Sequence, residues 1–231
     1  MSIVKRIVCP ANSRKVGGRC IAGREWTGSQ VGAWIRPVSS RPHEEVSEEE
    51  RQYEDGSDPK VLDLVDIPLI AARPRAWQQE NWLLDPMAYW ARRGRVGWQD
   101  LAAFADAPAV LWLNGFSTYH GQHDRVPLDQ ATGLTTSLHL VRTKSLTLSV
   151  FAPGAAFGDA KRKVFGRFRH EGTEYRLRVT DPVYERAYLA KADGDYTLAE
   201  CYLTVSLGEP WEGFAYKLIA AIIEQAGGVR G

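Results

Sequence analysis

Short apolar runs separated by turn-forming residues dominate the hydrophobic pattern of the chain. In the first half these runs are rich in Val, Ile and Leu, which is typical of β-strands. Gly, Ser and Asn lie between the first three runs, where the chain has to turn. We therefore expect strands over residues 3–9, 18–23, 33–38, 61–72 and 81–84.

Two stretches depart from this pattern and predict helices. Between residues 86 and 106, apolar residues recur at helical spacing but are interrupted by Gly94 and Gly97, so we expect two short helices. Near the C-terminus, apolar residues recur every four positions after Pro210, which predicts a helix with one apolar stripe. These residues are Phe214, Leu218 and Ile222.

The second half repeats the strand pattern of the first. We expect one long bent strand, a hairpin around the turn 170–173 and a further strand, over residues 138–150, 161–180 and 202–207. Because each half offers four or five short strands with a helix, the predicted fold class is mainly β with peripheral helices, as two consecutive OB-like small barrels. Residues 114–136 show little periodicity, so we expect an N-terminal domain over 1–113, a linker over 114–136 and a C-terminal domain over 137–231.

Length and composition fit a globular protein. The chain has 231 residues, of which 44% are hydrophobic and 25% charged, enough apolar material for a core without disulfides. No apolar run approaches the roughly 18 residues of a membrane helix. The initial Met-Ser-Ile-Val-Lys-Arg is too short and too charged for the apolar region of a signal peptide. We expect a soluble, cytoplasmic protein without a membrane partner.

Cysteines and histidines predict no metal or other cofactor. Cys9, Cys20 and Cys201 are an odd, widely spaced set among apolar neighbours, so we expect buried thiols. An alternative is that Cys9 is a nucleophile, although the sequence indicates no base for it. His120, His123 and Asp124 have the spacing of metal ligands, but without an evident fourth ligand we expect solvated loop histidines.

Charge is segregated along the chain despite a net charge of +1. Residues 1–42 hold eight bases and one acid, residues 43–66 hold ten acids and two bases, and residues 161–178 hold seven bases and two acids. Basic stretches of this kind indicate anionic partners. The alternative is that the acidic run folds over the first basic run, and charge alone favours neither interpretation.

The predicted hairpin over residues 161–180 is the most informative segment. Because alternate residues of a strand face opposite sides, one face of this hairpin is apolar and can enter a core. The other face displays six basic residues around Phe165, which is how OB folds hold single-stranded nucleic acid, with phosphates on cations and bases on an aromatic ring. The candidate binding residues are Lys163, Phe165, Arg167, Arg169, Arg176 and Arg178, together with Lys161.

A second candidate is the Gly-containing basic segment at residues 12–19, between two predicted strands. Glycine lets backbone N–H groups approach an anion, and three cationic side chains accompany it. The segment lacks the Gly-Lys-Ser/Thr ending of a Walker loop and predicts no NTPase. Arg36 and Arg41 lie close enough in sequence to face the same pocket.

Several blocks resemble the bacterial dual-OB-domain family. They comprise residues 5–9, 12–15, 19–23, 34–39, 206–210 and 216–218. The resemblance implies two consecutive OB folds acting in nucleic-acid or nucleotide recognition, including settings of defence against phage, and it brings no catalytic residue. Residue by residue it indicates Ser13, Arg14, Lys15, Arg19, Arg36, Arg41, Glu209 and Lys217.

We therefore expect a binding protein for nucleic acid, single-stranded or structured, or for a nucleotide. One alternative is an enzyme acting on such a ligand through a pocket around Arg14, Lys15, Arg36 and Glu209, with Glu209 or Cys9 as the reactive group. Another is a protein-interaction module, since OB barrels also serve as docking surfaces.

Overall fold

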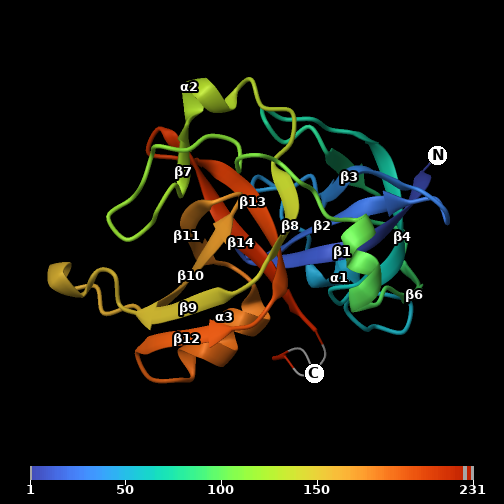
Figure 1. Ribbon diagram of the computed structural model, residues 1–231. Coiled ribbons are helices and arrows are strands. Elements are labelled where there is room, and N and C mark those ends of the chain that lie inside the picture. Colours follow the sequence, from blue (N-terminus) through green and yellow to red (C-terminus); the bar gives the residue numbers. More distant parts are fainter. Residues whose placement is uncertain (1, 226–227, 230–231) are drawn as a thin grey trace. The chain divides into compact units, whose positions relative to one another are not determined.

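The structure is a computed structural model that describes residues 2–225 and 228–229, and it divides into two compact units (Figure 1). The N-terminal unit comprises the residues up to Phe104 together with Thr135–Ser137, and the C-terminal unit comprises Ala105–Leu134 and the described residues from Leu138 onward. This division differs from the expected linker at 114–136. Within that segment, Gln122 and Arg125–Pro127 pair with strands of the C-terminal unit, and the segment up to Leu134 groups with that unit.

The N-terminal unit is a closed barrel of five strands. They are β1 (Ile3–Lys15), β2 (Gly18–Trp26), β3 (Val31–Val38), β4 (Asp63–Ala72) and β5 (Asn81–Leu84). Their order is β1-β2-β3-β5-β4, β3 and β5 run parallel, and pairing of β1 with β4 closes the barrel. This is the strand order of an OB fold. Its interior is apolar and includes Ile7, Ile21, Ile35 and Ile67.

Three further elements lie outside these five strands. They are α1 (Glu48–Arg51), β6 (Ala91–Arg95) and the 3-10 helix η1 (Trp98–Ala103). The two helices predicted over 86–106 are therefore wrong in their first half, where β6 pairs with Asp63–Asp66 of β4. Hydrogen bonding to a neighbouring strand prevails there over the helical spacing of a few apolar residues.

The C-terminal unit has the same topology with additional elements. Its elements are β7 (Arg125–Pro127), α2 (Leu128–Ala131), β8 (Leu138–Thr143), β9 (Leu146–Phe151), η2 (Ala155–Phe157), β10 (Lys163–His170), β11 (Thr173–Val179), α3 (Pro182–Leu189), β12 (Gly194–Leu198), β13 (Cys201–Trp211) and β14 (Phe214–Glu224). The order β9-β10-β11-β14-β13-β8 becomes that of an OB barrel when β8 and β9 are taken as one bent first strand. The predicted bent strand and hairpin are confirmed, and β10 and β11 are the second and third strands of this barrel.

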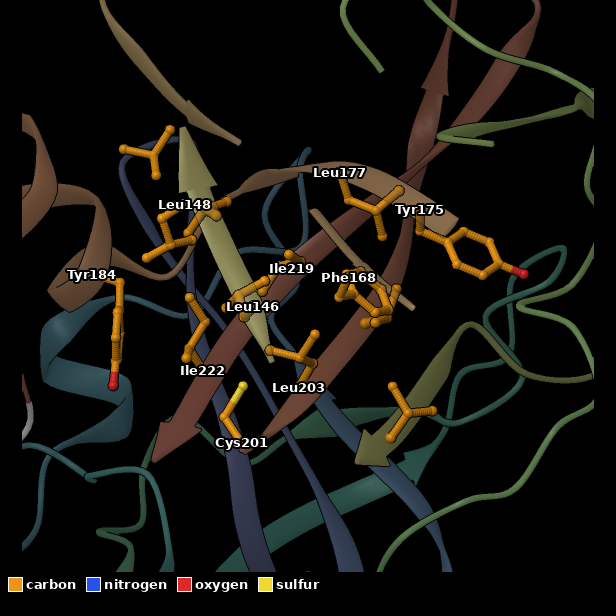
Figure 2. Packing of buried hydrophobic residues seen from close by; sticks show 14 of the residues in the cluster. Leu146, Leu148, Phe168, Tyr175, Leu177, Tyr184, Cys201, Leu203, Ile219 and Ile222 are labelled. Carbon is orange, nitrogen blue, oxygen red and sulfur yellow. The ribbon is translucent and has the colours of Figure 1, made fainter. Parts of the chain in front are cut away.

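The core of the C-terminal unit explains the position of Gly166 on β10. Leu146, Leu148, Phe168, Leu177 and Ile219 are among the side chains that fill the barrel (Figure 2). A Cβ on the inward-facing Gly166 would lie 2.5 Å from Ile219 Cδ1 and 3.0 Å from Leu146 Cδ1. A larger residue at this position would therefore require the ends of Ile219 and Leu146 to move.

The predicted C-terminal helix is wrong, because Phe214–Glu224 is the strand β14. It pairs with β13 along most of its length, and β13 includes Pro210. Ile219–Ile223 are buried on both faces of the strand. Glu212 lies in the β13–β14 turn with a φ of 47°. None of the helices in the described ranges is long and apolar enough to cross a membrane.

Candidate functional site

The hairpin of β10 and β11 separates its residues as the sequence predicts. Val164, Gly166 and Phe168 are buried on the barrel side, as are Tyr175, Leu177 and Val179 of β11. The turn consists of Glu171 and Gly172, with φ values of 45° and 76°. Positive φ at both positions is the geometry of a two-residue type I′ turn, whose twist matches that of the flanking strands.

The opposite face of the hairpin is cationic, and we call it the basic face. Arg167 lies opposite Arg176, Phe165 opposite Arg178, and Arg169 opposite Glu174. Arg167 and Arg169 are exposed, whereas Lys163, Arg176 and Arg178 are half-buried. Like charges placed directly opposite one another across two strands destabilise the pair, and a bound anion relieves that repulsion.

Neighbouring strands extend the basic face with hydroxyl groups. In the β9–β10 register Thr147 lies beside Arg167 and Ser149 beside Phe165. On β12, Thr197 and Asp195 continue these two rows. The basic face thus carries five cations on β10 and β11, and the carboxylates on the same side are Glu174 of β11 and Asp195 of β12. Glu174 lies 4.0 Å from Arg167 with both side chains partly exposed, a contact that is worth little in water.

Phe165 is not the exposed stacking platform expected from the sequence. It is only 8% exposed, because the ring of Phe151 packs against it with centroids 5.3 Å apart. The Arg176 guanidinium lies over both rings, 5.2 Å from Phe151 and 5.8 Å from Phe165. Its buried Nε donates no hydrogen bond within the described ranges. The two rings therefore position Arg176 on the basic face through cation–π contacts.

A groove of about 710 Å³ lies at the hairpin-turn end of the basic face. The β8–β9 turn and the β10–β11 turn line it, and its cations include Arg167, Arg169 and Lys144. Arg142 also lines it and pairs with Glu200 at 2.7 Å. The groove therefore adds Arg142 and Lys144 beside Arg167 and Arg169, together with the carboxylates of Glu171 and Glu174.

The basic candidates of the N-terminal unit are mostly engaged within that unit. Residues 12–19 are not a loop, because β1 and β2 extend to Lys15 and Gly18 and leave a two-residue turn. Ser13 is buried, Arg14 is exposed and Lys15 is half-buried. The backbone of Arg19 exchanges hydrogen bonds with Val46 of the acidic segment, each 2.9 Å long.

Arg36 and Arg41, expected to face a common pocket with this hairpin, form ion pairs instead. Arg41 pairs with Glu50. Arg36 is 2% exposed and lies 3.1 Å from Glu80 Oε1, while it donates a 2.7 Å hydrogen bond to Ser137 Oγ. Because Arg36 is buried, it is not accessible to nucleic acid, which contradicts the binding role predicted for it. For the same reason it cannot line the open pocket that the enzyme alternative requires.

Lys217 and Glu209 occupy adjacent strands of the C-terminal barrel. Glu209 is half-buried on β13, and Lys217 is 1% exposed on β14. The Lys217 ammonium donates to the Leu113 carbonyl at 2.5 Å and to Asn114 Oδ1 at 3.3 Å. Burial lowers the pKa of Lys217 to about 7, opposed by the weaker influence of Asp124. Lys217 therefore forms buried hydrogen bonds within the unit and is not accessible to a ligand.

Two of the three cysteines are buried as predicted, and Cys20 is not. Cys9 is fully buried in the N-terminal core, where a nucleophile has no access to a substrate. Burial raises the pKa of Cys201 to about 12, so this thiol does not ionise near neutral pH. Cys20 is half-buried, and all three cysteines are reduced.

The sequence pattern does not predict that residues 105–124, which we call the strap, pair with the C-terminal barrel through Gln122 and Arg176. His120 Nε2 donates to the Pro153 carbonyl at 2.9 Å, and His123 Nδ1 accepts a hydrogen bond from Gly115 N. The metal-like spacing of these residues therefore serves to fold the strap. Within the described ranges no cluster of three or more potential ligands is placed to hold a metal ion. The signal that could have indicated the strap is its three aromatic residues, Trp112, Phe116 and Tyr119.

Comparisons with known proteins address the whole chain. A family model described as the dual OB-containing domain matches residues 5–222. A search of curated proteins finds no match. The family match and the two barrel topologies agree with each other, and OB-fold domains generally bind nucleic acids or oligonucleotides.

Proposed function

The chain belongs to the family of dual OB-containing domains, and on that premise we propose that its C-terminal barrel binds nucleic acid along the basic face. The observation that carries the proposal is the location of the cations. They lie on the outer face of β10 and β11, the second and third strands of the barrel, and OB folds use this face for oligonucleotides.

Electrostatics explains what such a face contributes. Each phosphate that replaces solvent counterions on a Lys or Arg releases those ions, so binding weakens as salt rises. If all five cations contact phosphates of a single strand, the slope of log K against log salt is about −3 to −4. The groove next to Lys144 continues the path beyond Arg169.

The test compares charge reversals at two places, two on the basic face and one on α3. Arg167→Glu combined with Arg169→Glu removes the two exposed cations of β10, and Arg186→Glu changes an exposed arginine on α3. With a fluorescein-labelled oligothymidine, we expect the double variant to lose at least roughly thirtyfold in affinity and to have a slope that is shallower by one to two. The control is expected to stay within about threefold of the parent chain.

Two outcomes contradict the proposal. One is an unchanged affinity in the double variant, and the other is an equal loss in Arg186→Glu. Thermal unfolding monitors the fold, which we expect to be preserved because both substituted side chains are exposed. The bacterial defence setting and the cytoplasmic location stay predictions.

A further inference from the structure

Tyr119 on the strap is a large aromatic side chain left in solvent. It is 94% exposed. Its ring meets that of His120 edge-on, with centroids 4.7 Å apart. His120 in turn meets Phe151 at 5.1 Å, and Phe151 packs against Phe165 of the basic face. Tyr119 is therefore the solvent end of a continuous series of rings that begins under Arg176.

Hydrogen bonds fix the part of the strap that carries Tyr119. The carboxylate of Asp124, which is buried, accepts from Thr118 N at 2.7 Å and from Thr118 Oγ1 at 2.6 Å. A Cβ on Gly121 would lie 1.9 Å from Asp124 Oδ2, so only glycine fits between them. The exposure of Tyr119 thus occurs on an ordered turn.

The strap is also joined to the strand that carries the cations. Gln122 and Arg176 exchange backbone hydrogen bonds of 3.0 and 3.1 Å, which add the strap to the edge of β11. The strap lies beside β7 in Figure 1. Backbone pairing and ring contacts therefore both hold Tyr119 close to Arg176.

We propose that Tyr119 stacks on an unpaired base of the nucleic acid whose phosphates lie on the basic face. This inference rests on the proposed function and specifies its ligand as a single strand, since a paired base is already stacked within its duplex. A fixed, solvated aromatic ring beside a cationic track supplies the two elements of single-strand binding, a stacking surface and backbone contacts. Tyr119 thus takes the role expected of Phe165.

The experiment measures two ligands against three substitutions in the full chain. The probes are a labelled oligothymidine of about twelve nucleotides, within the range of one OB fold, and a blunt duplex of equal length. The substitutions are Tyr119→Ala, Tyr119→Phe and Tyr89→Ala, the last removing an exposed tyrosine of the N-terminal unit. Tyr119→Ala is expected to lower single-strand affinity between about fivefold and a hundredfold.

The remaining readouts separate stacking from other causes. Tyr119→Phe and Tyr89→Ala are expected to stay within about twofold of the parent, because the first retains the ring and the second lies in the other unit. The salt slope and the duplex affinity of Tyr119→Ala are expected to be unchanged, since no phosphate contact is lost.

The inference is overturned if Tyr119→Ala binds the single strand as the parent does, or if it loses equally on the duplex. If those results accompany a strong effect of the Arg167 and Arg169 reversal, the proposed function survives and only the stacking role of Tyr119 fails. An absence of oligonucleotide binding by the parent chain rejects both.

Discussion

The two barrels place very different surfaces on their second and third strands. In the N-terminal barrel the outward positions of β2 and β3 include Ala22, Trp34 and Arg36, all less than a tenth exposed. In the C-terminal barrel the corresponding face presents the exposed Arg167 and Arg169. One topology thus supports a face with a buried arginine and a face with two exposed arginines. The comparison teaches that the fold supplies a location, while the side chains decide whether a ligand can use it.

A buried cation is found in each barrel, Arg36 in the first and Lys217 in the second, and the two differ in the charge of their hydrogen-bond acceptors. Arg36 lies against the Glu80 carboxylate, whereas the acceptors of the Lys217 ammonium are a carbonyl and an amide oxygen. A buried carboxylate favours the charged form of its partner, but neutral oxygens compensate only part of the lost hydration. This explains why burial lowers the pKa of Lys217 so far.

The acidic segment of residues 43–66 accounts for the remaining contrast. Its carboxylates pair with arginines of the first basic run, as in Arg41–Glu50 and Arg6–Asp66. The interpretation in which this acidic run folds over the first basic run is therefore the better one. On the basic face, Arg167 lies 4.0 Å from Glu174 in a partly exposed contact, and the exposure of Arg167 and Arg169 directs the proposed function to the C-terminal barrel.

Among the tests of this contrast between the two barrels, the largest effect is a loss of stability, and we expect it on substitution of Glu80. Glu80→Gln leaves the buried Arg36 without its counter-charge, which should lower the free energy of unfolding by about 3–5 kcal/mol. Urea unfolding followed by tryptophan fluorescence measures it well, because six of the eight tryptophans lie in the N-terminal unit. Oligonucleotide affinity should not change in native conditions. A loss of stability below about 1 kcal/mol would show that Arg36 is not a structural cation.

A smaller effect on the free energy of unfolding, which depends on pH, is expected for Lys217→Met. The pKa of Lys217 falls from 10.5 in the unfolded chain to about 7 in the folded one, so between these values the unfolded state binds the additional proton. Stability should therefore rise with pH in this window, by about 1 kcal/mol per unit. The measurement compares urea unfolding of the parent and of Lys217→Met from pH 7 to 9. A difference between the two that does not vary with pH would contradict the assignment.

The smallest effect is expected at the β1–β2 hairpin of the N-terminal unit. Arg14→Glu combined with Lys15→Glu matches the charge change of the Arg167 and Arg169 reversal. We expect it to reduce oligonucleotide affinity less than about threefold at moderate salt, through long-range electrostatics alone. Fluorescence anisotropy under the same conditions compares the two variants. Equal losses would mean that the two barrels share the ligand and that the contrast between them is wrong.

The predictable parts of the fold are those that depend on the pattern of neighbouring residues in the sequence. The alternation in β10 and β11 identifies the apolar and basic faces, because a strand has a period of two. Spacing alone gave the wrong prediction for β14, which was expected to be a helix. Phe214, Leu218 and Ile222 are four residues apart, a spacing that fits one face of a strand as well as one face of a helix.

The parts that were not predictable depend on partners distant in sequence. Phe165 is covered because Phe151 lies on the neighbouring strand, and Arg36 is buried because Glu80 and Ser137 surround it. The strap has no hydrophobic period, since backbone hydrogen bonds and the buried Asp124 specify it. Tyr119 could therefore be recognised only after these contacts were known.

The two-residue turn at Glu171 and Gly172 has a consequence for changes in chain length. An extra residue there would shift the pairing of β11 by one position, turning Arg176 and Arg178 toward the barrel interior and Tyr175 and Leu177 toward solvent. Insertions are tolerated far better between β9 and β10, where an irregular connection already separates the strands. In related chains we therefore expect length variation between β9 and β10 and a constant length at the turn that orients the arginines.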